Sequence, residues 1–192
     1  MVWLIHQLTR SVPLWMFLLG GLVFVLFLFF VLPSEAARST EYFGGVEAPD
    51  TQFFYTGDDL VQIASAFGAE GRAYYIRSRF TFDIVWPLAY GFFLWSGLSW
   101  LKGLYKNRLL RYLPLIPIAA VVLDFLENSG ASLVMYVYPE RMPFITGLIP
   151  FFTALKWLTI GVSFALLAGL ALMILVIRTG ERRRQRIRTD TE

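Results

Sequence analysis

Long apolar runs constrain the fold of this chain more than any other feature of its sequence. Several windows longer than about eighteen residues carry almost no charge, and an α-helix needs roughly twenty apolar residues to cross a bilayer. Hydrophobic residues make up 57% of the 192 residues, which is typical of membrane proteins rather than of water-soluble domains. The sequence therefore predicts an all-α integral membrane protein that forms a single domain.

The distribution of basic residues sets the expected topology. Lysine and arginine gather before the first apolar run, between the second and third runs, and in a C-terminal tail. Because positively charged segments stay in the cytoplasm, both termini are expected inside. We expect a four-helix bundle in the inner (plasma) membrane of a bacterium, with spans at about residues 13–32, 72–101, 112–137 and 151–177. The tail, residues 178–192, is interpreted as a topology signal that contacts anionic lipids rather than nucleic acid.

The first apolar run has an alternative interpretation as a signal peptide. Arg10 precedes the run, and Ser34-Glu35-Ala36 resembles a cleavage site. The run is about twenty residues long, however, whereas the apolar part of a signal peptide usually has 7–15 residues. We therefore expect an uncleaved first span, in which Gly20 and Gly21 allow close packing against a neighbouring helix.

Residues 33–71 form the only sizeable segment expected outside the membrane, on the extracytoplasmic side. Thr56 and Asp59 have the spacing of a helix-capping box, and four apolar residues follow at helical spacing: Leu60, Ile63, Ala64 and Phe67. We expect a loop and then a short amphipathic helix that ends near Gly68. This helix could cover the mouth of the bundle as a lid, or fold back on the membrane as a simple tether.

Two carboxylates and an amide lie near the middle of the third apolar run. At 100° per residue, Asp124, Glu127 and Asn128 fall within an arc of about 100° on one helix face. A carboxylate at the centre of a membrane helix costs at least ~2.5 kcal/mol on insertion scales, so such groups usually face the bundle interior and have a partner. This helix is therefore predicted to turn one polar face inward.

Possible partners lie on the second and fourth spans. One face of the second span carries Arg72, Arg79, Asp83, Trp86 and Tyr90, and Lys156 lies in the fourth span. Pro87 should kink the second span near Asp83. Counting along the helices at about 1.5 Å per residue places these groups between the midplane and the outer membrane surface. We therefore predict a cavity that opens outward, with these ligand-binding candidates: Arg79, Asp83, Trp86, Tyr90, Asp124, Glu127, Asn128 and Lys156.

The same side chains have a purely structural interpretation. A hydrogen-bonded network could fix the register of the four helices without binding any ligand. The pairs expected in that network are Asp124 with Tyr90, Glu127 with Lys156, and Asp83 with Arg79. The sequence leaves the structural and the functional interpretation open.

The composition removes several kinds of site. Cysteine is absent, and the only histidine is His6, near the N-terminus. Thiolate chemistry, the usual zinc sites and Ser/His catalytic pairs are therefore not expected, and no metal or cofactor is predicted. If the protein is an enzyme, Asp124 and Glu127 are the candidate catalytic residues, as general acid and base.

Three groups of residues carry a resemblance to other proteins: Glu70-Gly71-Arg72, the Asp83/Pro87/Tyr90 pattern, and Asp124-x-x-Glu127-Asn128. With them the chain, from about Phe54 onward, resembles a set of bacterial four-span membrane proteins that has no established activity. The resemblance implies the architecture and no function. Emopamil-binding and sigma-2-type proteins are similar in architecture, as four-span bundles with acids in an aromatic cavity, but no motif is shared with them.

The expected function is the binding of a lipid or another amphiphile in the outward-facing cavity, or a role as an accessory membrane subunit. One alternative is an intramembrane enzyme that acts on a lipid or isoprenoid, and another is a component of proton- or cation-coupled transport. The expected partners are membrane lipids and an amphiphilic small molecule, with a homo-oligomer or a larger membrane complex possible.

Overall fold

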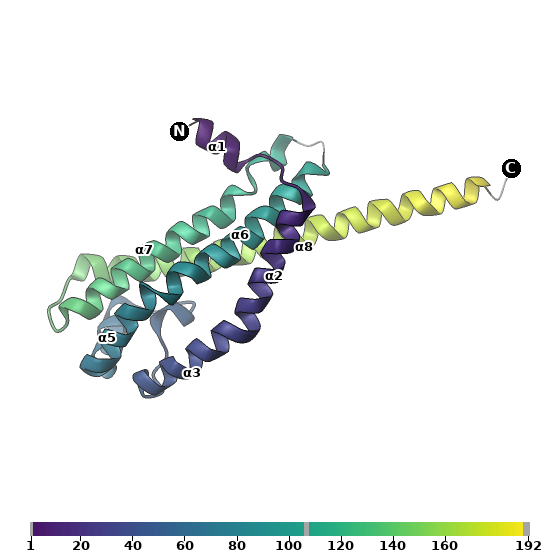
Figure 1. The fold of residues 1–192 in the computed structure, drawn as a ribbon. Helices are drawn as coiled ribbons and strands as arrows, with labels where there is room; N and C mark the ends of the chain where they lie inside the picture. Colours follow the sequence, from purple (N-terminus) through teal and green to yellow (C-terminus); the bar gives the residue numbers. More distant parts are fainter. Residues whose placement is uncertain (1, 106–107, 190–192) are drawn as a thin grey trace.

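The computed structural model describes residues 2–105 and 108–189, without the side chains of residues 2, 4, 108, 109 and 181–189. All regular secondary structure in this part of the chain is helical. Figure 1 shows three helices that run side by side, α6 (Phe82–Gly103), α7 (Leu115–Val137) and α8 (Pro143–Thr189). Helix α2 (Leu14–Leu26) packs against α6, and the chain that follows it diverges from the bundle.

Three helical stretches are long and apolar enough to cross a membrane: Leu14–Phe43, Gly68–Gly103 and Pro143–Gly180. Many of their apolar side chains are exposed, such as Leu18 and Leu22 on α2 and Leu172 and Leu175 on α8. Contiguous apolar surface of this kind is rare on water-soluble monomers and is expected where lipid covers the protein. Helix α7 is not one of the three stretches, so the count of four spans stays a prediction.

The helix that begins with α2, named the first helix because it is the first one long enough to cross a membrane, is longer than the sequence predicted. It continues beyond residue 32 through a π-helical turn, η1 (Phe27–Val31), into α3 (Leu32–Phe43), so the start of the expected loop is wrong. Pro33 lacks an N–H group, and its ring would clash with the carbonyl of residue i−4 in a regular helix. The π turn, in which the Leu32 N–H bonds the Phe27 carbonyl, widens the helix immediately before Pro33 and lets it continue.

Close packing of the first helix depends on Gly20. A Cβ atom at Gly20 would lie 3.0 Å from the Phe93 Cα on α6, so a larger residue would force the two helices apart. Around this contact Phe24 stacks on Phe93, with ring centroids 4.9 Å apart. The close approach expected for the glycine pair is therefore made by Gly20, whereas the Cβ position of Gly21 meets only the Phe93 ring at 3.6 Å.

Two short helices follow α3 and a 3-10 turn, η2 (Pro49–Thr51). They are α4 (Gly57–Ala66) and α5 (Gly68–Arg79). The predicted capping box is present, because the Asp59 N–H donates to Thr56 Oγ1 at 3.2 Å and the Thr56 N–H donates to Asp59 Oδ2 at 2.8 Å. The apolar face of α4 packs against α7 and α8, where it joins a buried cluster that includes Tyr75, Met135 and Ile149. Helix α4 therefore forms part of the packed bundle.

The second apolar stretch is interrupted where α5 meets α6. The break lies at Phe80 and Thr81, two to three residues before Asp83. Pro87 cannot donate a helical hydrogen bond to the Asp83 carbonyl, so the first turn of α6 lacks this bond. The interruption places Arg79 and Asp83 on two successive helices.

At the opposite end of α6, the chain between the second and third runs differs from the prediction. Lys102 was expected in a cytoplasmic loop, but it lies in the last turn of α6, where it is buried and its Nζ donates to the Thr9 carbonyl. Trp95 Nε1 donates to the Leu8 carbonyl at 2.9 Å, so the C-terminal end of α1 (Val2–Leu8) is bound to α6. A short 3-10 helix, η3 (Arg108–Tyr112), precedes α7, while Lys106 and the Arg108 side chain lie outside the described residues.

Helix α8 is also longer than predicted at both ends. It begins at Pro143 rather than near residue 151, and it continues past Arg178 to Thr189. Proline suits the first position of a helix because its N–H is not needed there. Figure 1 shows the C-terminal part of α8 extending well beyond the bundle. The tail arginines from Arg182 onward have side chains outside the described residues.

Candidate functional site

Asp124 is at the centre of the polar contacts between α6 and α7. Tyr90 on α6 donates its hydroxyl to Asp124 Oδ2 at 2.9 Å, and Asn128 donates Nδ2 to Asp124 Oδ1 at 2.9 Å, one turn along α7. All three side chains are buried. The pairing of Tyr90 with Asp124 that helix faces and depth predicted is confirmed, and both carboxylate oxygens of Asp124 accept a hydrogen bond from a neutral donor.

Glu127 and Lys156 form a buried ion pair between α7 and α8. Lys156 Nζ lies 2.6 Å from Glu127 Oε2, and the two side chains are 5% and 0% exposed. This predicted pair is also confirmed. Because Glu127 is enclosed, Lys156 neutralises it from within the bundle.

Arg79 holds two carboxylates with one nitrogen. Its Nη1 lies 2.7 Å from Asp83 Oδ2 and 2.6 Å from Asp50 Oδ2. Its guanidinium also lies over the ring of Tyr75, 4.5 Å from the centroid. The pairing of Arg79 with Asp83 was predicted, and the second carboxylate was not.

Asp50 is one of the cavity residues that were not predicted from the sequence. It belongs to η2, which was expected to be loop, and its carbonyl accepts hydrogen bonds from Trp157 Nε1 at 3.3 Å and Lys156 Nζ at 3.5 Å. Burial by itself raises the pKa of Asp50, but Arg79 and Lys156 more than offset this and hold the pKa below its ordinary value. The position of Pro49 beside it was the only local signal, and it indicates a turn rather than a site.

A cavity of about 500 Å³ lies between the first helix and the bundle. The first helix contributes one wall, with Phe24, Leu28 and Leu32, and the chain from Phe43 to Thr51 contributes another part. The facing wall comes from α6, α7 and α8, with Arg79 at the end of α5. This volume is in the range of pockets that hold small molecules.

The lining is divided between polar and apolar side chains. Six of the eight predicted ligand-binding residues line the cavity: Arg79, Asp83, Trp86, Tyr90, Asp124 and Lys156. Glu127 and Asn128 do not, and instead bind Lys156 and Asp124 behind the cavity wall. Apolar and aromatic side chains, including Ile160 and Phe164, make up much of the remaining surface.

Trp86 connects the polar and the aromatic parts of the wall. It meets Tyr90 edge-on at 5.7 Å and stacks on Phe24 of the first helix at 5.7 Å. The first helix therefore closes the cavity through aromatic contacts.

Other predicted polar residues lie elsewhere. Arg72 shares a helical face with Arg79 in the sequence, but its Nη1 donates to the Ala64 carbonyl at 2.9 Å and its guanidinium lies over Tyr138. Among the described residues, no three histidine, aspartate or glutamate side chains gather in the manner of a metal site.

Comparison of the chain with family models, with curated proteins and with solved structures finds no match.

Proposed function

We propose that this protein binds an amphiphilic molecule in the cavity between its first helix and its bundle, without catalysing a reaction. The single observation that carries the proposal is the division of the cavity lining. Charged and hydroxyl groups, among them those of Asp50, Arg79, Asp83, Tyr90 and Asp124, line the cavity together with apolar and aromatic side chains from the first helix and α8. A molecule with a polar head and an apolar body matches such a wall, because each part meets its own kind of surface.

The proposal includes the membrane arrangement. Helix α7 would be the third of four spans, since its 23 residues reach about 35 Å, which exceeds the hydrocarbon thickness. Both termini would then face the cytoplasm, and the cavity would lie in the outer half of the bilayer, beside lipid. A lipid-like molecule could enter it from the membrane.

Binding is favoured over catalysis by the position of the candidate catalytic residues. Glu127 is fully buried, is held by Lys156 and does not line the cavity, so it cannot reach a molecule bound there. Asp124 lines the cavity but already accepts hydrogen bonds at both oxygens. The candidate catalytic pair, Asp124 and Glu127, therefore has only one member within reach of a ligand.

The test is to fill the cavity. Ala36 lines it and the next residue, Ala37, does not, so Ala36→Trp and Ala37→Trp are a matched pair on α3. Native mass spectrometry of the detergent-purified protein would measure retained lipid and added dodecyl amphiphiles with cationic, neutral and anionic heads. We expect the original protein and Ala37→Trp to retain an amphiphile and Ala36→Trp to lose it. Equal retention by both variants, or retention of no amphiphile at all, would contradict the proposal.

A further inference from the structure

The charges on the cavity wall are unbalanced, and this imbalance bears on the kind of head group that fits. Among the described residues, five acidic side chains line the cavity, namely Glu35, Glu47, Asp50, Asp83 and Asp124. Only two basic side chains do so, Arg79 and Lys156. A cavity with this lining attracts positive charge into a region where water screens it poorly.

Both basic side chains are already paired with carboxylates. Arg79 is bound through one nitrogen to both Asp50 and Asp83, at 2.6 and 2.7 Å. Lys156 is bound to Glu127, at 2.6 Å, behind the wall. An anionic head would have to compete with these carboxylates for the same two cations, and separating a buried charge from its partner is strongly unfavourable.

Acidic side chains, in contrast, outnumber the basic ones on the wall. The two neighbours that hydrogen-bond Asp124 are the neutral groups of Tyr90 and Asn128, so these contacts give the carboxylate no counter-ion. Asp50 Oδ1 is buried and has no hydrogen-bond partner among the described residues. The Asp83 side chain is 7% exposed, and its ion pair with Arg79 uses Oδ2. A cationic group in the cavity would supply the missing charge.

The aromatic side chains near these carboxylates suit the same kind of group. Trp86 and Tyr90 line the cavity together with Trp157 from α8. The faces of such rings attract ammonium groups, most strongly where water is excluded. Apolar residues of the first helix, Leu28 and Leu32, continue the wall away from this region.

We propose that the bound amphiphile carries an ammonium head, which lies against Asp124 and Asp83 beside the ring of Trp86, with its apolar chain along the first helix. This inference rests on the proposed function and names the ligand class of the same cavity. The ammonium group can belong to an aminophospholipid or to a simple cationic amphiphile, because the wall recognises only the positive charge and the apolar chain that both share.

The experiment compares probes that have the same chain and different heads. Dodecyltrimethylammonium, dodecanol and dodecyl sulfate would be titrated against the detergent-purified protein, with native mass spectrometry as the readout, and a single-chain phosphoethanolamine lipid would form a fourth arm. We expect the fixed ammonium to bind at least about tenfold more tightly than the alcohol or the sulfate. Tighter binding of the phosphoethanolamine lipid than of dodecyltrimethylammonium would identify a lipid head group as the source of the ammonium. The reverse order would identify a simple cationic amphiphile.

Two variants locate the effect. Asp124→Asn removes one negative charge from the cavity wall and should abolish the preference for ammonium. Asp58→Asn removes the same charge from a side chain that is 86% exposed at the start of α4, and should leave the preference unchanged. The comparison of probes on the original protein remains decisive if Asp124→Asn does not fold.

The outcomes separate this inference from the proposed function. Binding of all three heads with equal affinity, or a preference for the sulfate, would overturn the ammonium assignment and leave amphiphile binding intact. Binding of none of the probes would overturn both proposals. A preference for ammonium that persists in a folded Asp124→Asn protein would overturn the assigned position of the head.

Discussion

Lys156 holds a fully enclosed carboxyl group in the interior of the bundle. Its ammonium is the ion-pair partner of Glu127, whose side chain is completely enclosed. We expect Lys156→Met to lower the free energy of unfolding by roughly 3–5 kcal/mol, because it leaves a buried carboxyl group without its partner. The measurement is unfolding by sodium dodecyl sulfate in mixed micelles.

The control is the double variant Glu127→Leu/Lys156→Met, which replaces the pair by apolar groups. Such replacements are often close to neutral, so the double variant should be clearly more stable than Lys156→Met alone. A double variant that is as unstable as the single one would show that Lys156 stabilises the protein through contacts other than its pair with Glu127.

Asp50 gives the protein a predictable response to acid. Its folded pKa lies below its ordinary value because Arg79 and Lys156 outweigh the effect of burial. The folded state therefore binds fewer protons than the unfolded state, and the stabilisation is complete above the ordinary pKa of about 4 and is lost as the pH falls through the lower, folded value. We expect the thermal midpoint of Asp50→Asn in a non-ionic detergent to fall less steeply than that of the original protein below about pH 4.

The exposed Asp58→Asn variant is the matched control for this measurement, since it removes one carboxylate and leaves Arg79 untouched. It should follow the original protein through the acid range. If Asp50→Asn also follows the original protein, the ion pair between Arg79 and Asp50 does not contribute to stability.

At the scale of single residues, contacts between helices were predictable and contacts from loops were not. Helical periodicity and depth together placed Tyr90 against Asp124 and Lys156 against Glu127, and both pairs are present. Asp50 has no periodicity to orient it, because it lies in a turn whose position depends on the packing of distant helices. Glu35, expected in a loop, lies on α3 and accepts a hydrogen bond from Tyr74 at 2.8 Å.

Among the elements, α4 depends on a glycine for its contact with α8. A Cβ atom at Gly57 would lie 2.9 Å from the carbonyl oxygen of Thr146, and backbone atoms cannot move aside as a flexible side chain can. We expect Gly57→Ala to destabilise the docking of α4 by about 1–3 kcal/mol, as overpacking does elsewhere, even though alanine is the better helix former. Hydrogen exchange at the amides of Leu60 and Ile63 would show this as a loss of protection.

Gly147→Ala is the control on the other side of the same contact. No atom lies within 4 Å of a Cβ placed at Gly147, so this substitution should leave exchange in α4 unchanged. Equal protection of α4 in the Gly57→Ala and Gly147→Ala variants would mean that the close approach of the α4 and α8 backbones does not contribute to stability.

The sequence predicted which segments are helical more accurately than it predicted where the helices end. The capping box at Thr56 and the apolar spacing after it predicted α4 well, since both signals are local. Two predicted helix boundaries, at Pro33 and at Pro150, are wrong, because a helix continues through each of these prolines. A π turn before Pro33 makes that continuation possible, and a single sequence gives no signal for such a turn.

For the molecule as a whole, the cavity is formed by parts of the chain that were expected to lie apart. The polar wall on α6, α7 and α8 was expected, whereas α3 and the turn at Asp50 were expected to form a loop outside the bundle. The position of α3 depends on the π turn and on the packing of Phe24 against Trp86 and Phe93, contacts between residues far apart in the chain. The cavity could therefore be predicted on one side only.

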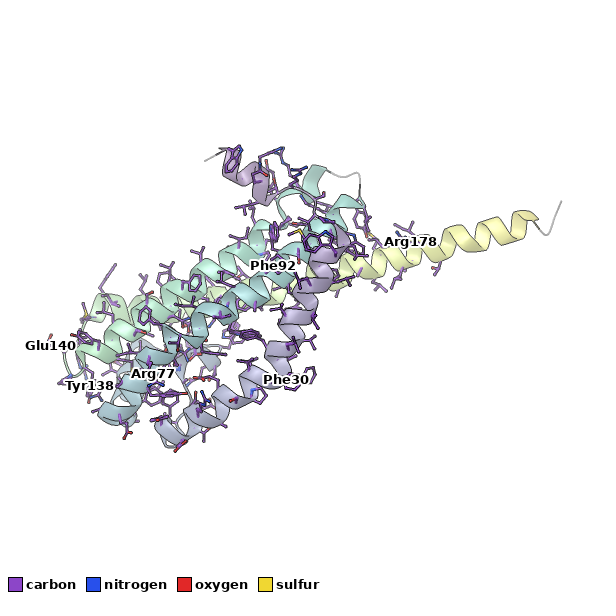
Figure 2. The ribbon with its side chains drawn as sticks, viewed as in Figure 1. Phe30, Arg77, Phe92, Tyr138, Glu140 and Arg178 are labelled. Carbon is purple, nitrogen blue, oxygen red and sulfur yellow. The ribbon has the colours of Figure 1, made fainter. Side chains whose placement is uncertain are left out.

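The number of membrane crossings decides where the cavity lies. The chain has no cysteine, so single cysteines introduced at exposed positions report their side of the membrane without interference. Figure 2 shows Glu140, between α7 and α8, and Arg178, on the extended part of α8, at opposite ends of the molecule. With four spans, Glu140→Cys and Glu41→Cys in intact bacterial cells should react with an impermeant maleimide, and Thr179→Cys should react only after the membrane is opened.

If the chain crossed the membrane three times, two of the three labelling results would be reversed and one would be unchanged. If α7 did not cross, the chain would still place Glu41 outside after its first span, but Glu140 would remain in the cytoplasm and α8 would carry Thr179 outside. Glu41→Cys is thus an internal control, whereas Glu140→Cys and Thr179→Cys exchange their reactivities between the two arrangements. Because the polar face of α7 is covered by α6 and α8, through Tyr90 and Lys156, insertion of this helix exposes none of its carboxylates to lipid, and we expect the four-span pattern.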